Sequence, residues 1–219
     1  MTDYTQELTE TISLTSEKVT YIASFVDGTW SEFCKIGICA ESGTEVEFQA
    51  ITETIDIDIG DKDFDAIATL GGARVIKFTP EEPITITLEA YPTEAGTASG
   101  TSGKGFFDLM NTADASQPIQ ISANRTRSPY RLVVLWTDDS NNPTASGSIL
   151  KGKQALRMVA AGGKFSGVKP SFTDGILKFT VTYKVKPFDS SGNANFKMES
   201  VDTTQPLDAL AAYTSSTKW

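Results

Sequence analysis

Five aspartates, each with a side chain that could bind a metal ion, lie within ten positions between two apolar segments. They occupy Asp56, Asp58, Asp61, Asp63 and Asp65. An EF-hand calcium loop requires glycine at its sixth position and glutamate at its twelfth. Counted from the first aspartate, glycine comes at the fifth position and isoleucine at the twelfth, so the motif fails. Paired carboxylates also serve glycoside hydrolysis, but no aromatic sugar platform lies beside these. We interpret the cluster as a solvated hairpin face and predict no metal site, with a looser calcium site as the alternative.

Other groups on which catalysis usually depends are scarce. The sequence contains no histidine, which removes histidine-based triads and most metal-binding motifs. Its two cysteines, Cys34 and Cys39, cannot supply the four ligands of a structural zinc site. A local disulfide is one interpretation of this pair, and two small buried apolar side chains are the favoured one. We therefore expect no enzymatic activity and no cofactor.

Two sets of basic residues allow two interpretations each. Arg125, Arg127 and Arg131 form a small group, and Lys178 and Lys184 alternate with threonines along one apolar segment. By default, the arginines pair with carboxylates of their own acidic chain and the lysines belong to a solvated sheet face. Alternatively, both sets contact acidic groups of a neighbouring subunit and help to fix its register.

Charge and composition narrow the class of protein. The chain has 219 residues, of which 39% are hydrophobic, and a net charge of −9. This is enough apolar material for a globular core, and the acidity argues against tight phosphate binding. The first ten residues are polar, unlike a signal peptide, and no apolar run is long enough to span a bilayer. We expect a soluble protein, made in the cytoplasm, with no membrane partner.

The elements that position these residues are predicted to be strands. Thr44–Ile59 and Ala73–Pro92 alternate apolar and polar residues, as strands with one buried face do. They form a long hairpin whose turn is expected at Gly60–Asp65. The alternation changes parity between Ile51 and Thr54, which predicts a β-bulge, and prolines at positions 80 and 83 interrupt the return leg.

The rest of the chain predicts an all-β domain with one accessory helix. Residues 1–10 are expected to be a flexible arm, 11–200 a single all-β domain, and 201–219 a C-terminal tail with a possible helical turn at Leu207–Ala212. The helix is expected at Gly105–Ala115, after the glycine-rich segment Thr93–Lys104. Further strands are expected within Thr11–Phe25 and at Trp30–Ile38, Ile119–Ile121, Tyr130–Thr137, Gln154–Ala161 and Ile176–Lys186.

Several short fragments, taken in order, resemble the tail tube (major tail) proteins of tailed viruses of bacteria and archaea. They are Ile55–Asp63, Gly71 with Gly72, Phe78–Pro80, Glu89–Pro92, Gly105–Leu109, Tyr130–Leu132, Trp136 with Thr137, Lys169–Gly175, Lys178 with Phe179, and Lys186–Phe188. The resemblance implies a β-sandwich with a flanking helix, assembled as stacked and commonly hexameric rings. In that family each subunit contributes strands to a continuous barrel. Its partners would be further copies of the chain and other tail proteins (tape measure, terminator and baseplate), in a virion tail assembled in the host cytoplasm.

This resemblance gives roles to the charged residues. Viral DNA would pass through the lumen without specific binding, repelled by an acidic wall. The wall is expected to include Glu45, Glu47, Asp56 and Asp58. The hairpin turn, with Asp61, Lys62, Asp63 and Asp65, would contact the next ring, and Arg125, Arg127, Arg131, Lys178 and Lys184 would contact neighbouring subunits. The arm, the glycine-rich segment and the tail would become ordered on stacking.

Alternative functions keep the same fold class. A carbohydrate-binding or adhesin module would need a platform of exposed aromatic side chains, and Trp30, Trp136 and Trp219 are widely separated in sequence. A tail terminator or a secretion-system tube would differ from a tail tube in the length of the assembly.

Overall fold

The computed structural model describes residues 33–48, 50–60, 64–68, 74–78, 82–92, 129–141, 143–201 and 205–219, and within these it is all-β. The all-β prediction is confirmed, whereas the expected helix at Gly105–Ala115 and the expected N-terminal arm lie outside the described residues. The strands are β1 (Phe33–Ala40), β2 (Val46–Glu47), β3 (Ala50–Asp58), β4 (Phe64–Ala68), β5 (Arg74–Phe78), β6 (Ile84–Pro92), β7 (Tyr130–Thr137), β8 (Ala155–Thr173), β9 (Ile176–Val185) and β10 (Phe196–Ser200).

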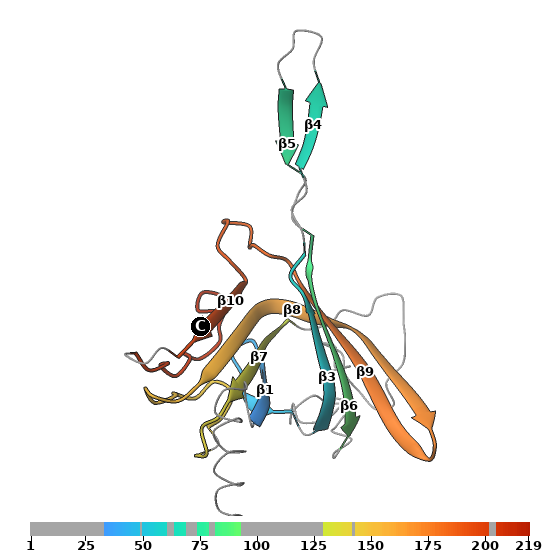
Figure 1. Cartoon of the computed structure of the whole chain (residues 1–219), viewed down its shortest axis with the longest axis vertical. Helices are drawn as coiled ribbons and strands as arrows, with labels where there is room; N and C mark the ends of the chain where they lie inside the picture. The colour runs from blue at the N-terminus through green and yellow to red at the C-terminus, as the bar shows by residue number, and fades with distance from the viewer. Residues whose placement is uncertain are drawn as a thin grey trace, which may run out of the picture.

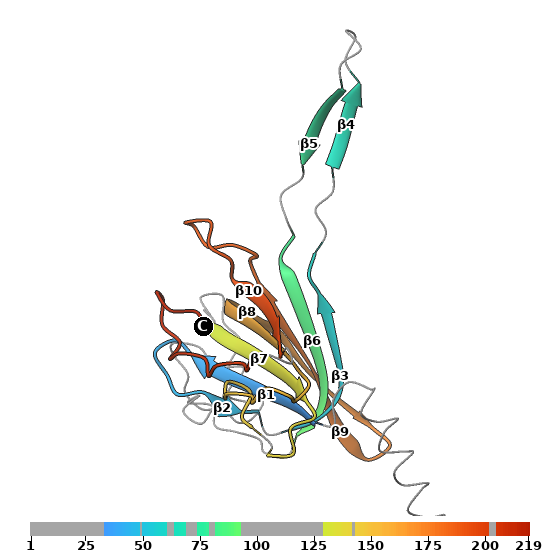
Figure 2. The same cartoon turned by 60° about the vertical axis from the view of Figure 1, so that its left-hand side comes forward.

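One antiparallel sheet, in the order β2-β1-β7-β8-β9-β6-β3, folds back on itself because β8 belongs to both of its halves (Figure 1). The first part of β8 pairs with β7 and β10, and its second part pairs with β9. The main core fills the space between the halves, with apolar side chains from β1 and β7 on one side and from β6 and β9 on the other. Figure 2 shows the first half (β1, β7, β10 and the start of β8) beside the second half (β3, β6 and β9).

Two bulges allow β8 to bend. The register with β7 skips Gly162, which has a φ of 80°, and the register with β9 skips Ser166. Bulges of this kind increase the local twist of a strand. The sequence predicted a strand only at Gln154–Ala161, which covers the first part of β8 up to the bulge at Gly162.

The buried Tyr183 hydroxyl joins three strands at the bend. Its oxygen accepts a hydrogen bond from the Gly163 amide at 2.9 Å, and it lies 2.9 Å from the Tyr130 carbonyl and 3.0 Å from the Ala160 carbonyl, to either of which it can donate its proton. The Tyr183 ring also packs edge-on against Phe165, with their centroids 5.2 Å apart. The close approach requires glycine at 163, since a Cβ there would lie 2.3 Å from the Tyr183 ring.

Substitution of Gly163 by alanine is expected to lower the free energy of unfolding by about 1–3 kcal/mol, because the new methyl group would displace Tyr183 from its hydrogen bonds. Gly167→Ala is the matched control in the same strand, because its Cβ would meet nothing closer than 3.9 Å. Urea unfolding of both variants measures the difference. Equal stability of the two variants would contradict this role for the bend.

The long hairpin is present, but its turn is not where the sequence indicated. β3 pairs with β6, from Ala50 opposite Pro92 to Asp58 opposite Thr85, and β4 pairs with β5 in a separate two-stranded sheet, from Phe64 opposite Phe78 to Ala68 opposite Arg74. The turn therefore lies between Ala68 and Arg74, and Asp65 lies in a strand, opposite Lys77. The predicted bulge is confirmed by a register shift between Thr52 and Thr54.

The C-terminal tail packs on the outer side of the first half. A second apolar cluster joins Val133 and Leu135 of β7 to Ile149 and Leu207, with Trp219 packed against it. Leu207 and Ile149 exchange two backbone hydrogen bonds of 2.9 and 3.0 Å, so the tail is extended there and the expected helical turn is absent. The described part of the tail, residues 205–219, thus has packing and hydrogen-bond partners within its own subunit.

Candidate inter-subunit surface

The outer face of the second half of the sheet brings together charged residues from four strands. On β3, Asp56 and Asp58 are exposed, whereas Ile55 and Ile57 point to the core. Side chains alternate between faces along a strand and align across neighbouring strands. The row that begins with Asp58 therefore continues through Thr85 on β6 and Lys184 on β9 to Lys164 on β8.

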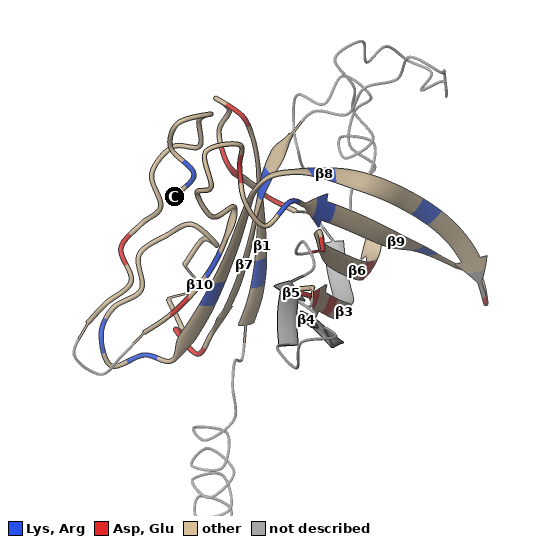
Figure 3. Cartoon of the chain, turned by 90° about the horizontal axis from the view of Figure 1, so that it is seen from above, with Lys and Arg blue, Asp and Glu red and all other residues tan. Residues whose placement is uncertain are grey.

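Charge on this outer face changes sign from one edge to the other (Figure 3). The β3 edge carries the two aspartates, and the β8 edge carries Lys164 and Lys169, both exposed. Between the edges, Lys178 on β9 forms an ion pair with Glu89 on β6, with 2.8 Å between Nζ and Oε2. Among the ion pairs of the described residues, none includes the four charged groups at the edges.

Neither edge has a second partner strand within the described part of the chain. Among the described strands, β3 pairs only with β6, and the second part of β8, from Lys164 to Thr173, pairs only with β9. Each therefore presents a row of backbone N–H and C=O groups without a strand partner, which in a soluble monomer favours pairing with another chain. The two edges thus border one outer face, which is acidic at the β3 edge and basic at the β8 edge.

The acidic residues predicted for one continuous strand separate into two places. β2 pairs with β1, through Glu47 opposite Gly37, so Glu45 and Glu47 belong to the first half of the sheet. Glu45 accepts a hydrogen bond from Arg131 at 3.0 Å, and Glu47 lies 3.4 Å from Lys35. The chain crosses from one half of the sheet to the other between β2 and β3. The prediction of a single strand at Thr44–Ile59 is therefore wrong, because this segment forms two strands, β2 and β3, with different partners. The two glutamates do not share the face of Asp56 and Asp58.

Arg131 lies inside the subunit. Its side chain is 2% exposed and pairs with Glu45, and its Nη1 donates a 2.7 Å hydrogen bond to the carbonyl of Ala211 in the tail. Its guanidinium also lies over the Tyr213 ring, 5.7 Å from the centroid. This is pairing within its own chain, so Arg131 is not part of the exposed surface. The other two arginines of that predicted group, Arg125 and Arg127, lie outside the described residues. The same holds for three residues of the expected hairpin turn, Asp61, Lys62 and Asp63.

Sequence reasoning missed a second buried arginine, Arg157. It is 1% exposed and donates from Nη1 to the Gly147 carbonyl at 2.7 Å, from Nη2 to the Asp208 carbonyl at 2.6 Å, and from Nε to Glu199 at 2.5 Å. The signal for it is a lone charge within the apolar strand Ala155–Ala161. A charge in such a position predicts a buried ion pair, because an unpaired one would be too costly. Arg157 thus joins β8 to β10, to a loop and to the tail.

The outer end of the tail is fixed by a third ion pair. The Lys218 ammonium lies 2.8 Å from Asp189, which also accepts backbone hydrogen bonds from Ser191 and Asn193. The Lys218 hydrogen bond, followed by that from the Asn193 backbone, lowers the pKa of Asp189 well below its ordinary value of 3.8. Burial alone would raise the pKa of Glu199 above its ordinary 4.5, but hydrogen bonds and charge from Lys197 and Arg157 outweigh burial and lower it.

Acidification is therefore expected to loosen the tail. A carboxyl group with a lowered folded-state pKa contributes stability above its unfolded-state pKa and loses it as pH falls through the folded-state value. Protection of residues 205–219 from hydrogen exchange should be full at neutral pH and decline below the ordinary values of 3.8 and 4.5. Asp189→Asn should reduce this pH dependence. Equal protection of the tail at pH 7 and pH 3 would contradict it.

The described residues contain neither a cluster of metal ligands nor a disulfide. No group of three or more His, Cys, Asp or Glu side chains is arranged there to hold a metal. Both cysteines are free, Cys34 exposed and Cys39 buried. A shallow hollow on the outer sheet face has Glu89, Tyr91 and Lys178 in its lining, with the ion pair across it. No described helix has the length and hydropathy to cross a membrane.

Comparison with known proteins gives structural similarity alone. No family model matches the sequence, and no curated protein matches it. Among solved structures, a chain from the sheath–tube complex of an extracellular contractile injection system, in the extended state, is similar with a TM-score of 0.42 and 14% identity, over 76% of this chain and 89% of that one. A chain from the sheath/tube terminator of an extracellular contractile injection system is similar with a TM-score of 0.41 and 13% identity, over 75% and 93% of the two chains. The tube-terminating cap of the anti-feeding prophage gives a TM-score of 0.40 and 9% identity, over 76% and 88%.

Proposed function

We propose that the chain is a structural subunit that assembles edge to edge into rings, which stack into the tail tube of a virus. The observation that carries this proposal is the pair of open edges, β3 and the second part of β8, with opposite charge on one shared face. In this proposal the aspartates of one copy lie against Lys164 and Lys169 of the next.

Strand direction supports such a contact. The strands β3, β6, β9 and β8 alternate in direction, because each pairs antiparallel with the next. The two edge strands therefore run in opposite directions, and β3 of one copy would meet β8 of the next as an antiparallel pair. A contact between two different surfaces of the same chain is heterologous, and it produces a ring wherever the rotation closes. We call β3, β6, β9 and the second part of β8 the four-stranded segment. Repetition of this segment around the ring would form a barrel without open edges.

The outer face of this segment would line the lumen, because the core and the first half of the sheet occupy the other side (Figure 1). Its described charges are the carboxylates Asp56, Asp58 and Glu89 and the lysines Lys164, Lys169, Lys178 and Lys184. Such a wall has both signs, with threonines between them, rather than the uniformly acidic surface expected from the sequence. In the assembly, the edge charges would pair across each junction, which leaves the DNA a wall of nearly balanced charge.

The hairpin β4–β5 provides a surface for contact between rings. It extends beyond the ends of β3 and β6, away from the body of the subunit (Figure 1). Within the tail tube function, its partners would be the subunits of the next ring. The tape measure, terminator and baseplate would be further partners in a virion tail assembled in the host cytoplasm, with no membrane partner.

Electron microscopy of negatively stained protein at rising concentration, together with size-exclusion chromatography and light scattering, tests the proposal. Rings or tubes of uniform diameter are expected. A single ring that never extends would instead indicate a terminator. Monomers at every concentration, up to the solubility limit, would contradict assembly by the chain alone.

A carbohydrate-binding module has less support. Trp136 is half-buried and packs against the main core, and Trp219 packs on the tail cluster with Lys197 5.4 Å from its ring centroid. Among the described residues these two tryptophans therefore form no exposed platform, and Trp30 lies outside those residues.

A further inference from the structure

The end of the β8–β9 hairpin has exposed apolar side chains on the face that elsewhere contacts the core. Phe172 is 73% exposed and Leu177 is 41% exposed, and these two residues are directly opposite each other in the strand pair. Pro170, also exposed, lies on the same face of β8. We call Pro170, Phe172 and Leu177 the apolar stripe.

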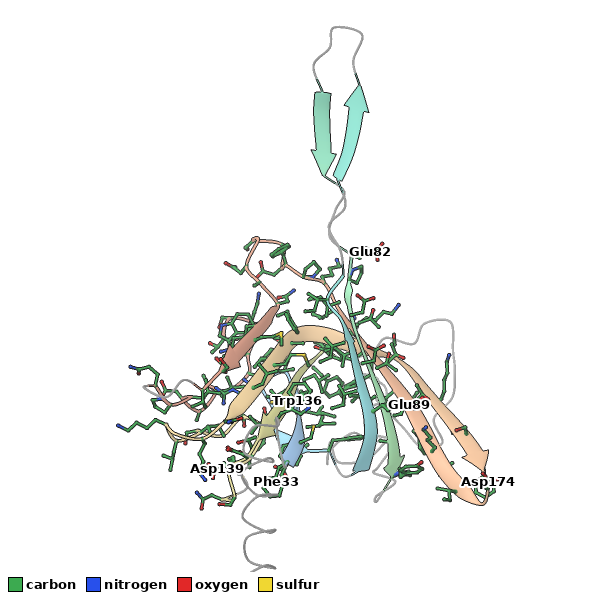
Figure 4. All side chains as sticks on the ribbon, viewed as in Figure 1. Phe33, Glu82, Glu89, Trp136, Asp139 and Asp174 are labelled. Carbon is green, nitrogen blue, oxygen red and sulfur yellow. The ribbon has the colours of Figure 1, made fainter. Side chains whose placement is uncertain are left out.

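The stripe continues the buried face of the hairpin beyond the end of the core. Val168 and Phe179, nearer to the bend, lie on the same face and pack against the main core. Figure 4 shows why the burial stops, since the hairpin continues to Asp174 at its turn, away from the crowded side chains between the two halves. Large apolar side chains clustered in this way mark interaction surfaces more often than scattered ones do.

We infer that the apolar stripe is covered by a second copy of this chain, the copy whose β3 contacts the β8 edge. This inference deepens the proposed function and rests on it. The stripe is on the edge strand whose opposite face presents Lys164 and Lys169. A neighbouring β3 in contact with that edge has aspartates on the lysine side of the sheet and Ile55 and Ile57 on the stripe side.

The apolar side of β3 supports this occupant. Ile55 and Ile57 are only partly buried in the single subunit, and Ile59, which follows them on the same face, is 51% exposed. Each edge of the four-stranded segment thus has one charged face and one apolar face. A single head-to-tail contact would bring the aspartates of one copy to the lysines of the next on one face, and the isoleucines to the apolar stripe on the other. Desolvated apolar anchors beside a charged rim are typical of specific protein interfaces.

Phe172→Ser with Leu177→Ser tests the stripe, and Phe188→Ser with Met198→Ser is the matched control. Phe188 and Met198 are 46% and 48% exposed and lie outside the hairpin end. Sedimentation velocity of the full chain should show self-association weakened about tenfold or more by the first pair of changes. The control pair should associate as the unchanged chain does, and both variants should have an unchanged melting temperature by circular dichroism.

Other outcomes overturn the inference in distinct ways. If the stripe variant associates normally while Asp56→Lys with Asp58→Lys does not, the proposed function stands and the inference about the stripe fails. If the stripe variant loses its fold, or melts well below the control, the stripe is covered within its own chain and the inference fails. If the unchanged chain never associates, both fail.

Discussion

Replacement of Arg157 by methionine is expected to lower the free energy of unfolding by about 3–5 kcal/mol, because it removes the buried guanidinium of an ion pair and leaves two backbone carbonyls without their hydrogen-bond donor. The loss includes the hydrogen bonds to the carbonyls of Gly147 and Asp208, which connect a loop and the tail to β8. Chemical denaturation measures the change in stability. Hydrogen exchange should show that residues 205–219 lose protection with it.

Lys197→Met is the control for this prediction. Lys197 is the second partner of Glu199, at 2.8 Å, but it is 26% exposed, so its loss should cost no more than about 1 kcal/mol. Replacement of both Arg157 and Glu199 by methionine should recover part of the stability lost in the single variant, since the partly buried Glu199 carboxylate is then no longer left with Lys197 as its only charged partner. A loss for Arg157→Met as small as that for Lys197→Met would contradict the role of Arg157 in holding the tail.

Charge reversal at the β3 edge is expected to prevent assembly without loss of the fold. In the proposed assembly, Asp56→Lys with Asp58→Lys would place lysines opposite Lys164 and Lys169 of the next copy, so attraction at the junction would become repulsion. Exposed ion pairs contribute about 0.2–1 kcal/mol each. Loss of two pairs and gain of two repulsions should weaken each junction by about 10–100-fold. Light scattering measures the association, and circular dichroism should show an unchanged β-sheet spectrum because both aspartates are exposed.

Glu41→Lys with Asp208→Lys makes the same change in net charge on the other half of the molecule, where both side chains are exposed. This control variant should assemble normally. Equal loss of assembly in the two variants would mean that net charge, and not the β3 edge, controls association.

Alternation along the chain was enough to predict most strands and the class of fold. Tyr130–Thr137 has the bounds of β7, and the parity shift after Ile51 marked the bulge in β3. The turn of the long hairpin was misplaced because residues 60–65 are polar, like a turn. Phe64–Ala68 nevertheless forms a strand, paired across the hairpin with Arg74–Phe78. A short polar interruption in a ribbon and a true turn have the same local sequence signal, and only the pairing distinguishes them.

The charged surface depended on contacts far apart in sequence. Lys164 and Lys169 were not identified, because β8 was predicted to end before Gly162, and the continuation of the strand depends on the bulge there and on the Tyr183 hydroxyl. Pairing with a carboxylate of its own chain was the default interpretation for Arg131, but its partner Glu45 comes from a segment 86 positions away. Such pairings follow from the path of the chain, which local periodicity does not determine.

A mixing experiment tests the central claim most directly. One variant has Asp56→Lys and Asp58→Lys, so both of its edges are basic, and the other has Lys164→Glu and Lys169→Glu, so both of its edges are acidic. Each variant alone should stay monomeric, and an equimolar mixture should form rings or tubes visible by electron microscopy, with the two chains alternating. A mixture that stays monomeric while the unchanged chain assembles, or either variant that assembles alone, would contradict pairing of the β3 edge with the β8 edge.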